Sequence, residues 1–125
     1  MRMDRTEKTD GPMVSAIGRG GFRVDDGYYA ALLMTPKRAD GWTPPPFEDL
    51  SGAAIESVLT LEPAPEFLLL GTGAILRHPP LAFRKALDAR GIGIEAMDSR
   101  AAARAWAVLR GEGRWIAAVL YPLEA

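Results

Sequence analysis

The chain contains no cysteine, which excludes disulfide bonds, thiolate metal ligands and cysteine nucleophiles. It has one histidine, His78, whereas a zinc site needs three or more protein ligands. We therefore expect no bound metal and no cofactor, and His78 is interpreted as an exposed loop residue before Pro79. The lack of cysteine also favours a cytoplasmic location.

The chain also lacks an excess of either charge and any long apolar run. Its net charge is -1, so it has no basic field for a nucleic-acid partner. No apolar run approaches the about 20 residues that span a bilayer, so we expect no transmembrane segment. Without a strong basic amphipathic helix, peripheral membrane association has little support but stays open. The polar composition of residues 1–10 predicts a disordered tail, and residues 11–125 have the size of one domain.

The N-terminal half reads as short strands and turns. Alternating apolar residues and Gly-rich turns predict strands over residues 13–18, 22–24 and 28–35. Residues 36–46 are rich in proline and predict a long loop. Residues 48–61 are compatible with a short helix that Ser51 caps.

The C-terminal half alternates strands and helices and indicates an α/β fold. Strands are predicted over residues 67–70, 92–96 and 115–121, and helices run from Pro79-Pro80 to about Arg90 and from Asp98 or Ser99 to about Arg110. Such alternation predicts parallel pairing in one sheet. The short link before the last strand leaves its direction open, parallel or antiparallel.

A Gly-Thr-Gly loop follows the first of these strands, at Gly71, Thr72 and Gly73. Ligands of open α/β sheets bind beyond the carboxyl ends of the strands, and free N–H groups of a glycine loop suit an anion. Arg77, His78 and Arg84 could add a basic rim. The alternative is a tight turn in which glycine provides a positive φ. The loop matches neither the P-loop nor the dinucleotide-binding pattern.

Two carboxylates and one tryptophan are further candidates. Glu95 lies within an apolar strand, so we expect it to be partly buried and paired with Arg114 or Arg104, with acid–base chemistry as the alternative. Asp98 is interpreted as a helix cap. Trp42 lies among prolines, and we expect it near the Gly-Thr-Gly loop, either as a lid on the core or as a contact residue.

Three segments together resemble one small protein family: PEFLLLGTG, GIGIEAMDS and EGRWIAAVLYP. This family of bacterial and archaeal proteins of unknown function includes the mitochondrial complex I assembly factor and the animal adipogenesis-associated Mth-domain protein. The resemblance covers roughly residues 22–122. It implies a single three-layer α/β domain, with a mixed central sheet, helices on both faces and additional N-terminal strands. It also implies a cleft lined by seven residues: Gly71, Thr72, Gly73, Glu95, Met97, Asp98 and Arg114.

The resemblance favours a non-enzymatic interaction or assembly-factor module with a protein partner, and a homo-oligomer is compatible with it. The family tends to carry polar residues where this chain has Ala103 to Ala107, and a threonine where Ser99 stands. Those differences weaken a catalytic role for this helix. The alternative function is a small-anion binding protein or enzyme that uses the Gly-Thr-Gly loop and Glu95.

Overall fold

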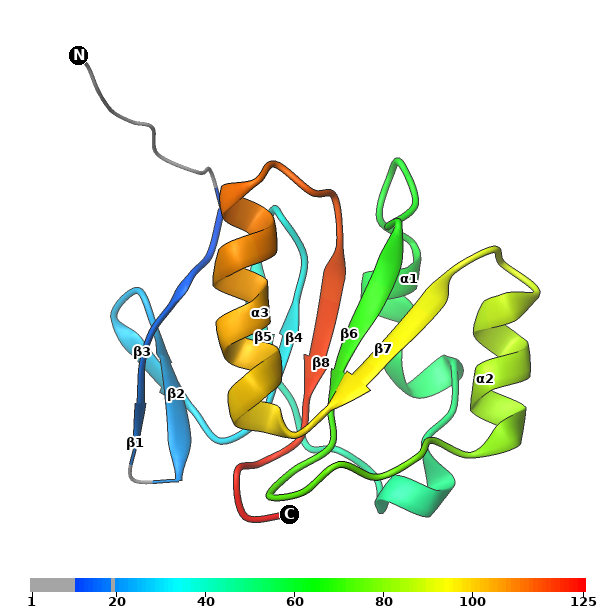
Figure 1. Cartoon of the computed structure of the whole chain (residues 1–125), viewed down its shortest axis with the longest axis horizontal. Helices are drawn as coiled ribbons and strands as arrows, with labels where there is room; N and C mark the ends of the chain where they lie inside the picture. Colours follow the sequence, from blue (N-terminus) through cyan, green and yellow to red (C-terminus); the bar gives the residue numbers. More distant parts are fainter. Residues whose placement is uncertain (1–10, 19) are drawn as a thin grey trace.

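The computed structural model describes residues 11–18 and 20–125, so the predicted tail over residues 1–10 lies outside the described residues. A five-stranded mixed sheet in the order β5-β4-β8-β6-β7 forms the centre, and a three-stranded antiparallel sheet in the order β1-β2-β3 lies beside it (Figure 1). The strands of the central sheet are β4 (Leu32–Met34), β5 (Ala39–Gly41), β6 (Phe67–Gly71), β7 (Gly93–Met97) and β8 (Ala117–Leu120).

The three strands predicted in the C-terminal half share the central sheet, as expected. β6 pairs in parallel with β7 on one side and with β8 on the other. The last strand is therefore parallel to β6, and it is antiparallel to β4. β6 and β8 are covered on both faces, which explains why both read as continuous apolar runs.

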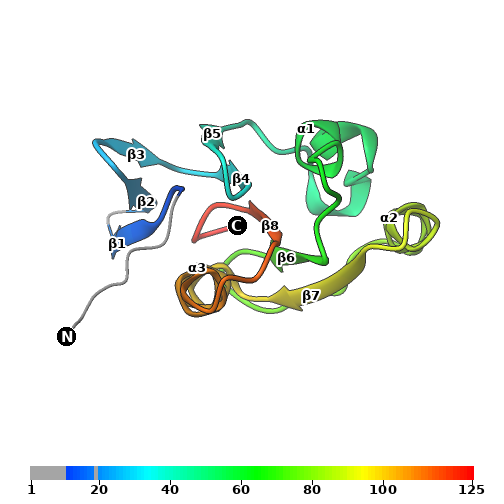
Figure 2. The ribbon, with the colours of Figure 1, turned by 90° about the horizontal axis from the view of Figure 1, so that it is seen from above.

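Helices cover both faces of the central sheet, which confirms the three-layer architecture (Figure 2). The helix α3 (Ser99–Gly111) lies on one face. The helix α2 (Leu81–Asp88), the short helix α1 (Glu56–Leu59) and the 3-10 turns η2 (Phe47–Asp49) and η3 (Ala53–Ile55) lie on the other. The alternation along β6 divides the core, because Leu68 and Leu70 pack towards α2 while Leu69 packs towards α3.

The alanine-rich face of α3 allows this helix to lie close to the sheet. Ala102 and Trp106 are fully buried, and Leu109 packs against the same cluster, as the spacing predicts. The indole Nε1 of Trp106 donates to the carbonyl of Pro12 at 2.9 Å. This bond ties the segment before the N-terminal sheet to α3.

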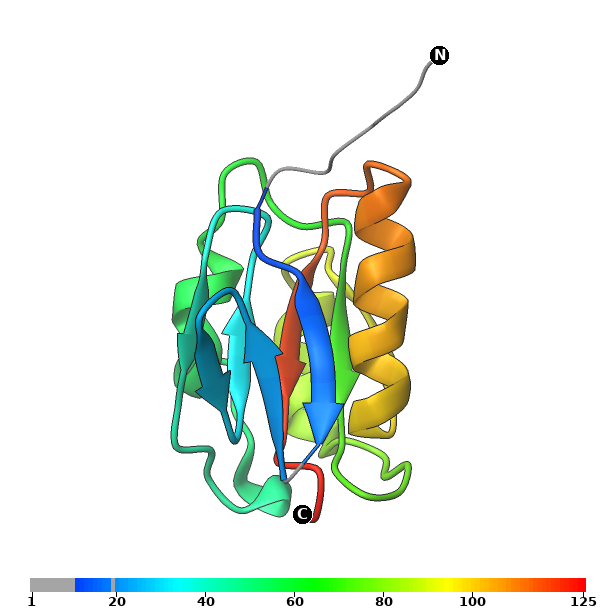
Figure 3. The same cartoon turned by 90° about the vertical axis from the view of Figure 1, so that its left-hand side faces the viewer.

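The N-terminal sheet consists of β1 (Val14–Gly18), β2 (Gly21–Val24) and β3 (Gly27–Tyr29), and it stands beside α3 on the same side of the central sheet (Figure 3). Its buried residues Phe22 and Val24 join the cluster of Trp106. The turn between β2 and β3 uses Asp25 at a φ of 51°, a conformation that aspartate tolerates better than most residues.

Three predictions for the N-terminal half are wrong in detail. The strand expected over residues 28–35 is divided between β3 and β4, which belong to different sheets because the chain bends at Ala30 and Ala31. The proline-rich loop contains the short strand β5, which pairs with β4. The helix expected over residues 48–61 is broken into η2, η3 and α1, although the hydroxyl of Ser51 does accept from the Ala54 N–H at 3.3 Å.

Candidate functional site

The Gly-Thr-Gly loop leaves the carboxyl end of β6, beside the first turn of α3. A side chain at Gly71 would overlap Ser99 and Leu120, so α3 can approach the strand only at a glycine. Gly73 has a φ of +107°, and a side chain there would strike the backbone of Ala125. Both glycines are therefore explained by local geometry, which supports the tight-turn interpretation.

The backbone donors of this loop already have acceptors within the protein. Thr72 N–H donates to the Met97 carbonyl at 2.9 Å, and Gly73 N–H donates to the Ser99 hydroxyl at 2.8 Å. Ala74 N–H donates to the Ala125 carbonyl at 3.0 Å. An anion would have to displace these bonds, so the loop does not offer the open nest of N–H groups that anion binding uses.

Ser99 is the residue that joins the loop, α3 and the end of β8. Its side chain is fully buried, and its hydroxyl accepts from Gly73 and donates to the Tyr121 carbonyl at 2.8 Å. Its own N–H donates to the Gly73 carbonyl at 2.8 Å. The sequence offered Ser99 only as an alternative cap, whereas Asp98 is the cap and accepts from the Ala101 N–H at 2.9 Å.

Thr72 and Arg77 fix the segment that follows the loop. The Thr72 hydroxyl donates to the Ile75 carbonyl at 2.6 Å and accepts from the Arg77 N–H at 3.0 Å. The Arg77 guanidinium donates twice to the Thr72 carbonyl, at 3.0 and 2.8 Å, and lies over the ring of Phe47, 4.3 Å from its centre. Arg77 is thus used within the protein rather than in a basic rim.

Trp42 lies beside the loop, as expected. Its ring meets that of Tyr121 edge to face with centroids 5.8 Å apart, and its Nε1 donates to the Leu120 carbonyl at 3.5 Å. Tyr121 N–H in turn donates to Gly71. Trp42 is half-buried against the core, which fits the lid interpretation, and its role as a contact residue stays a prediction.

The structure contradicts the expectations for Glu95 and Arg114. Glu95 is exposed and forms no ion pair with the residues that the structure describes, because β7 is the edge strand and α3 lies over β6 and β8 instead. Arg114 precedes β8 and so lies at the opposite end of the sheet from the Gly-Thr-Gly loop. It pairs with Glu66 at 2.8 Å and thereby lowers the pKa of that carboxyl.

The remaining candidates are either exposed or bonded within the loop and the helix. His78 is exposed, as expected, while Met97 and Asp98 are half-buried at the end of β7 and serve the loop and the helix. In residues 11–18 and 20–125, no serine or threonine hydroxyl bonds to a histidine or carboxylate, and no group of three potential metal ligands occurs. Within the same residues, no helix has both the length and the apolar content to cross a membrane.

Replacing Ser99 with alanine should destabilise the protein by about 2 kcal/mol, because it leaves the buried N–H of Gly73 and the carbonyl of Tyr121 without a partner. Chemical denaturation measures this loss. Ser15→Ala is the matched control, since Ser15 is exposed and its single bond to Arg23 is 3.4 Å long. Equal stability of the two variants would contradict the bridging role of Ser99.

Tyr121 should make stability fall in alkaline solution. Burial raises the pKa of Tyr121 to about 12, with Arg77 opposing the shift, and its hydroxyl donates to the Pro45 carbonyl at 2.8 Å. The folded state therefore holds the proton more tightly than the unfolded state above about pH 10, so stability should decrease by about 1 kcal/mol between pH 9 and 11. Denaturation of the wild type and of Tyr121→Phe at both pH values checks this, since the variant should lack that component.

Comparison with known proteins identifies a family for this chain. The family model described as "Protein of unknown function (DUF498/DUF598)" matches residues 14–121. An uncharacterised protein of Rhodobacter capsulatus is 32% identical over 111 residues, which cover 88% of this chain and 84% of that protein. The zebrafish NADH dehydrogenase [ubiquinone] 1 alpha subcomplex assembly factor 3 is 28% identical over 95% of this chain and 69% of its own.

Several solved structures share this fold. A crystal structure of a Bordetella parapertussis protein has a TM-score of 0.81 at 31% identity and covers 93% of this chain and 99% of that chain. The solution structure of a Bordetella pertussis protein, described as an Mth938-like domain, has a TM-score of 0.79 at 26% identity, with 99% and 94% covered. A Bartonella henselae structure described as an outer membrane protein has a TM-score of 0.76 at 31% identity, with 91% and 97% covered. The match over residues 14–121 shows that this chain belongs to the DUF498/DUF598 family of proteins of unknown function.

Proposed function

We propose that this protein is a non-enzymatic interaction module of the assembly-factor kind, which binds a partner protein through an aliphatic surface at the carboxyl end of the central sheet. The surface consists of Ile75, Leu76 and Leu81, whose side chains are 66%, 52% and 59% exposed. The three residues lie within seven consecutive positions after β6, and large aliphatic side chains exposed on one segment are candidates for an interaction site. This exposure is the observation that carries the proposal.

The backbone beneath this aliphatic surface is already ordered. Ile75 is held by the Thr72 hydroxyl, and the segment after it is held by Arg77, which packs on Phe47. Leu81 begins α2 directly after Pro79 and Pro80. A partner would therefore meet a preorganised surface, and little conformational entropy would be lost on binding.

The name of one relative supports a protein as the partner. The zebrafish relative is named as an assembly factor, which is a role exercised on other proteins. We extend that role to this chain, with a protein as its partner and a cytoplasmic location, and self-association is a further form that the interaction can take. Anion binding by the Gly-Thr-Gly loop has less support, because the N–H groups of Thr72, Gly73 and Ala74 are engaged within the protein.

The double substitution Ile75→Ser and Leu76→Ser should reduce recovery of the partner at least about tenfold, since each truncated anchor residue of an interface typically costs more than about 1 kcal/mol. The measurement is affinity purification of the tagged protein from its native host, with quantitative mass spectrometry. Because both side chains are exposed, the melting temperature should stay close to that of the wild type.

Val108→Ser is the matched control, because Val108 is 60% exposed but lies on α3, away from this surface. It should recover the partner like the wild type. The proposal fails if the double variant and the control recover the same proteins in the same amounts.

A further inference from the structure

We propose that the open edge of β7 takes up an extended segment of a partner protein as an added strand. This inference rests on the proposed function, because it needs a protein partner. Beyond the proposed function, it specifies the conformation of the bound segment, which is a β-strand, and the charges of its side chains. In this mode, backbone hydrogen bonds provide affinity and alternate side chains provide specificity.

β7 ends the central sheet, and its five residues pair only with β6. Figure 2 shows α2 on one side of this edge and α3 on the other, with no described segment beyond the strand. β7 contains neither proline nor a register shift, which are two common ways of protecting an edge strand.

The edge presents unpaired backbone groups. The Met97 carbonyl points towards β6, because it accepts from the Thr72 N–H at 2.9 Å. Backbone groups alternate along a strand, so the N–H and C=O of Ile94 and of Ala96 point away from β6. No hydrogen bond of the described residues uses these outward groups, and they form a ready template for another strand.

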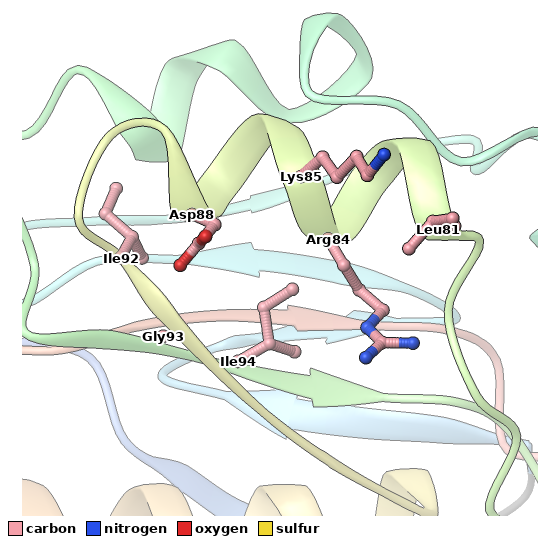
Figure 4. A pocket seen from close by; sticks show the side chains of 7 residues that line it. All are labelled: Leu81, Arg84, Lys85, Asp88, Ile92, Gly93 and Ile94. Carbon is pink, nitrogen blue, oxygen red and sulfur yellow. The ribbon is translucent and has the colours of Figure 1, made fainter.

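A groove between β7 and α2 adjoins this edge (Figure 4). Its volume is about 390 Å³, and it is lined by apolar and charged side chains: Leu81, Arg84, Lys85, Asp88, Ile92, Gly93 and Ile94. Ile94 is half-buried on the strand, and Figure 4 shows the Arg84 side chain reaching down from α2 beside it. Alternate side chains of an added strand would enter this groove.

The two faces of the edge carry opposite charges. Arg84, Lys85 and Asp88 lie on the groove face and together give it a net positive charge, whereas Glu95 points to the other face, the one that carries α3. Neither Arg84 nor Glu95 forms an ion pair with any described residue. Complementarity therefore selects a segment with apolar and acidic residues on its groove face and a basic residue opposite Glu95.

The same charges favour another protein over a second copy of this chain. Two β7 strands that paired antiparallel about their central residue would place two Glu95 side chains opposite each other. Like charges in directly opposite positions are destabilising. Glu95 in the middle of the edge thus discourages self-pairing and is satisfied by a basic residue of a partner.

The test uses a phage library of random peptides of about twelve residues, panned on the full chain. Selected peptides should alternate apolar or acidic residues for the groove face with a basic residue opposite Glu95. Their binding should protect the amides of Ile94 and Ala96 from hydrogen exchange. Ala96→Pro removes one outward donor without touching the β6 pairing, and it should weaken binding at least about tenfold. Ala96→Gly is its control, because it keeps the N–H group, and it should bind like the wild type.

Reversal of the charge at position 95 provides a second test of the inference. Glu95→Lys should weaken the selected peptides at least about fivefold, whereas Glu112→Lys, the same change in the exposed turn after α3, should not. The inference is overturned if no peptide is selected, or if the selected peptides leave the amides of Ile94 and Ala96 unprotected. It is also overturned if the β7 edge binds a second copy of this chain. Light scattering would then show a dimer, and Ala96→Pro would dissociate it. If Ile75→Ser and Leu76→Ser abolish partner recovery while Ala96→Pro and Glu95→Lys do not, the proposed function stands and strand addition falls.

Discussion

The buried hydroxyl of Ser99 is the interaction on which the carboxyl end of the sheet depends. It accepts from Gly73 and donates to Tyr121, so one side chain joins the loop after β6, the start of α3 and the end of β8. The bridge requires a close approach, and glycine at position 71 permits it. In the low-dielectric interior such a satisfied polar group helps to specify one arrangement, because any alternative would leave buried donors unpaired.

This bridge turns a loop that resembles a ligand site into a closed turn. The donors that an anion would need are bound to Met97, Ser99 and Ala125. The aromatic rings of Trp42, Phe47 and Tyr121, together with Arg77, then pack around the closed turn. The result is an ordered support for the exposed Ile75 and Leu76.

The sequence predicted the C-terminal half well, because strands with continuous apolar runs and helices with glycine stops carry strong local signals. It could not predict that Glu95 would be exposed, since a strand at the edge of a sheet has the same local pattern as one inside it. Arg114 was misplaced for a related reason: family position does not say at which end of the sheet a residue lies. The bend at Ala30 and Ala31 contains neither glycine nor proline, so no local signal predicts it. The hydrogen-bond partners of the Ser99 hydroxyl are 26 and 22 residues away in the sequence, so local patterns do not indicate them either.

The family and its solved members agree on the architecture but leave the biochemical role open, so the nature of the Gly-Thr-Gly loop is the point that most needs a direct measurement. Titration of the isotope-labelled protein with inorganic phosphate, followed through its amide resonances by NMR, provides it. A closed turn predicts that the amides of Thr72, Gly73 and Ala74 are protected from hydrogen exchange and do not shift. Saturable shifts confined to these amides at millimolar phosphate would contradict the account and restore the loop as an anion site.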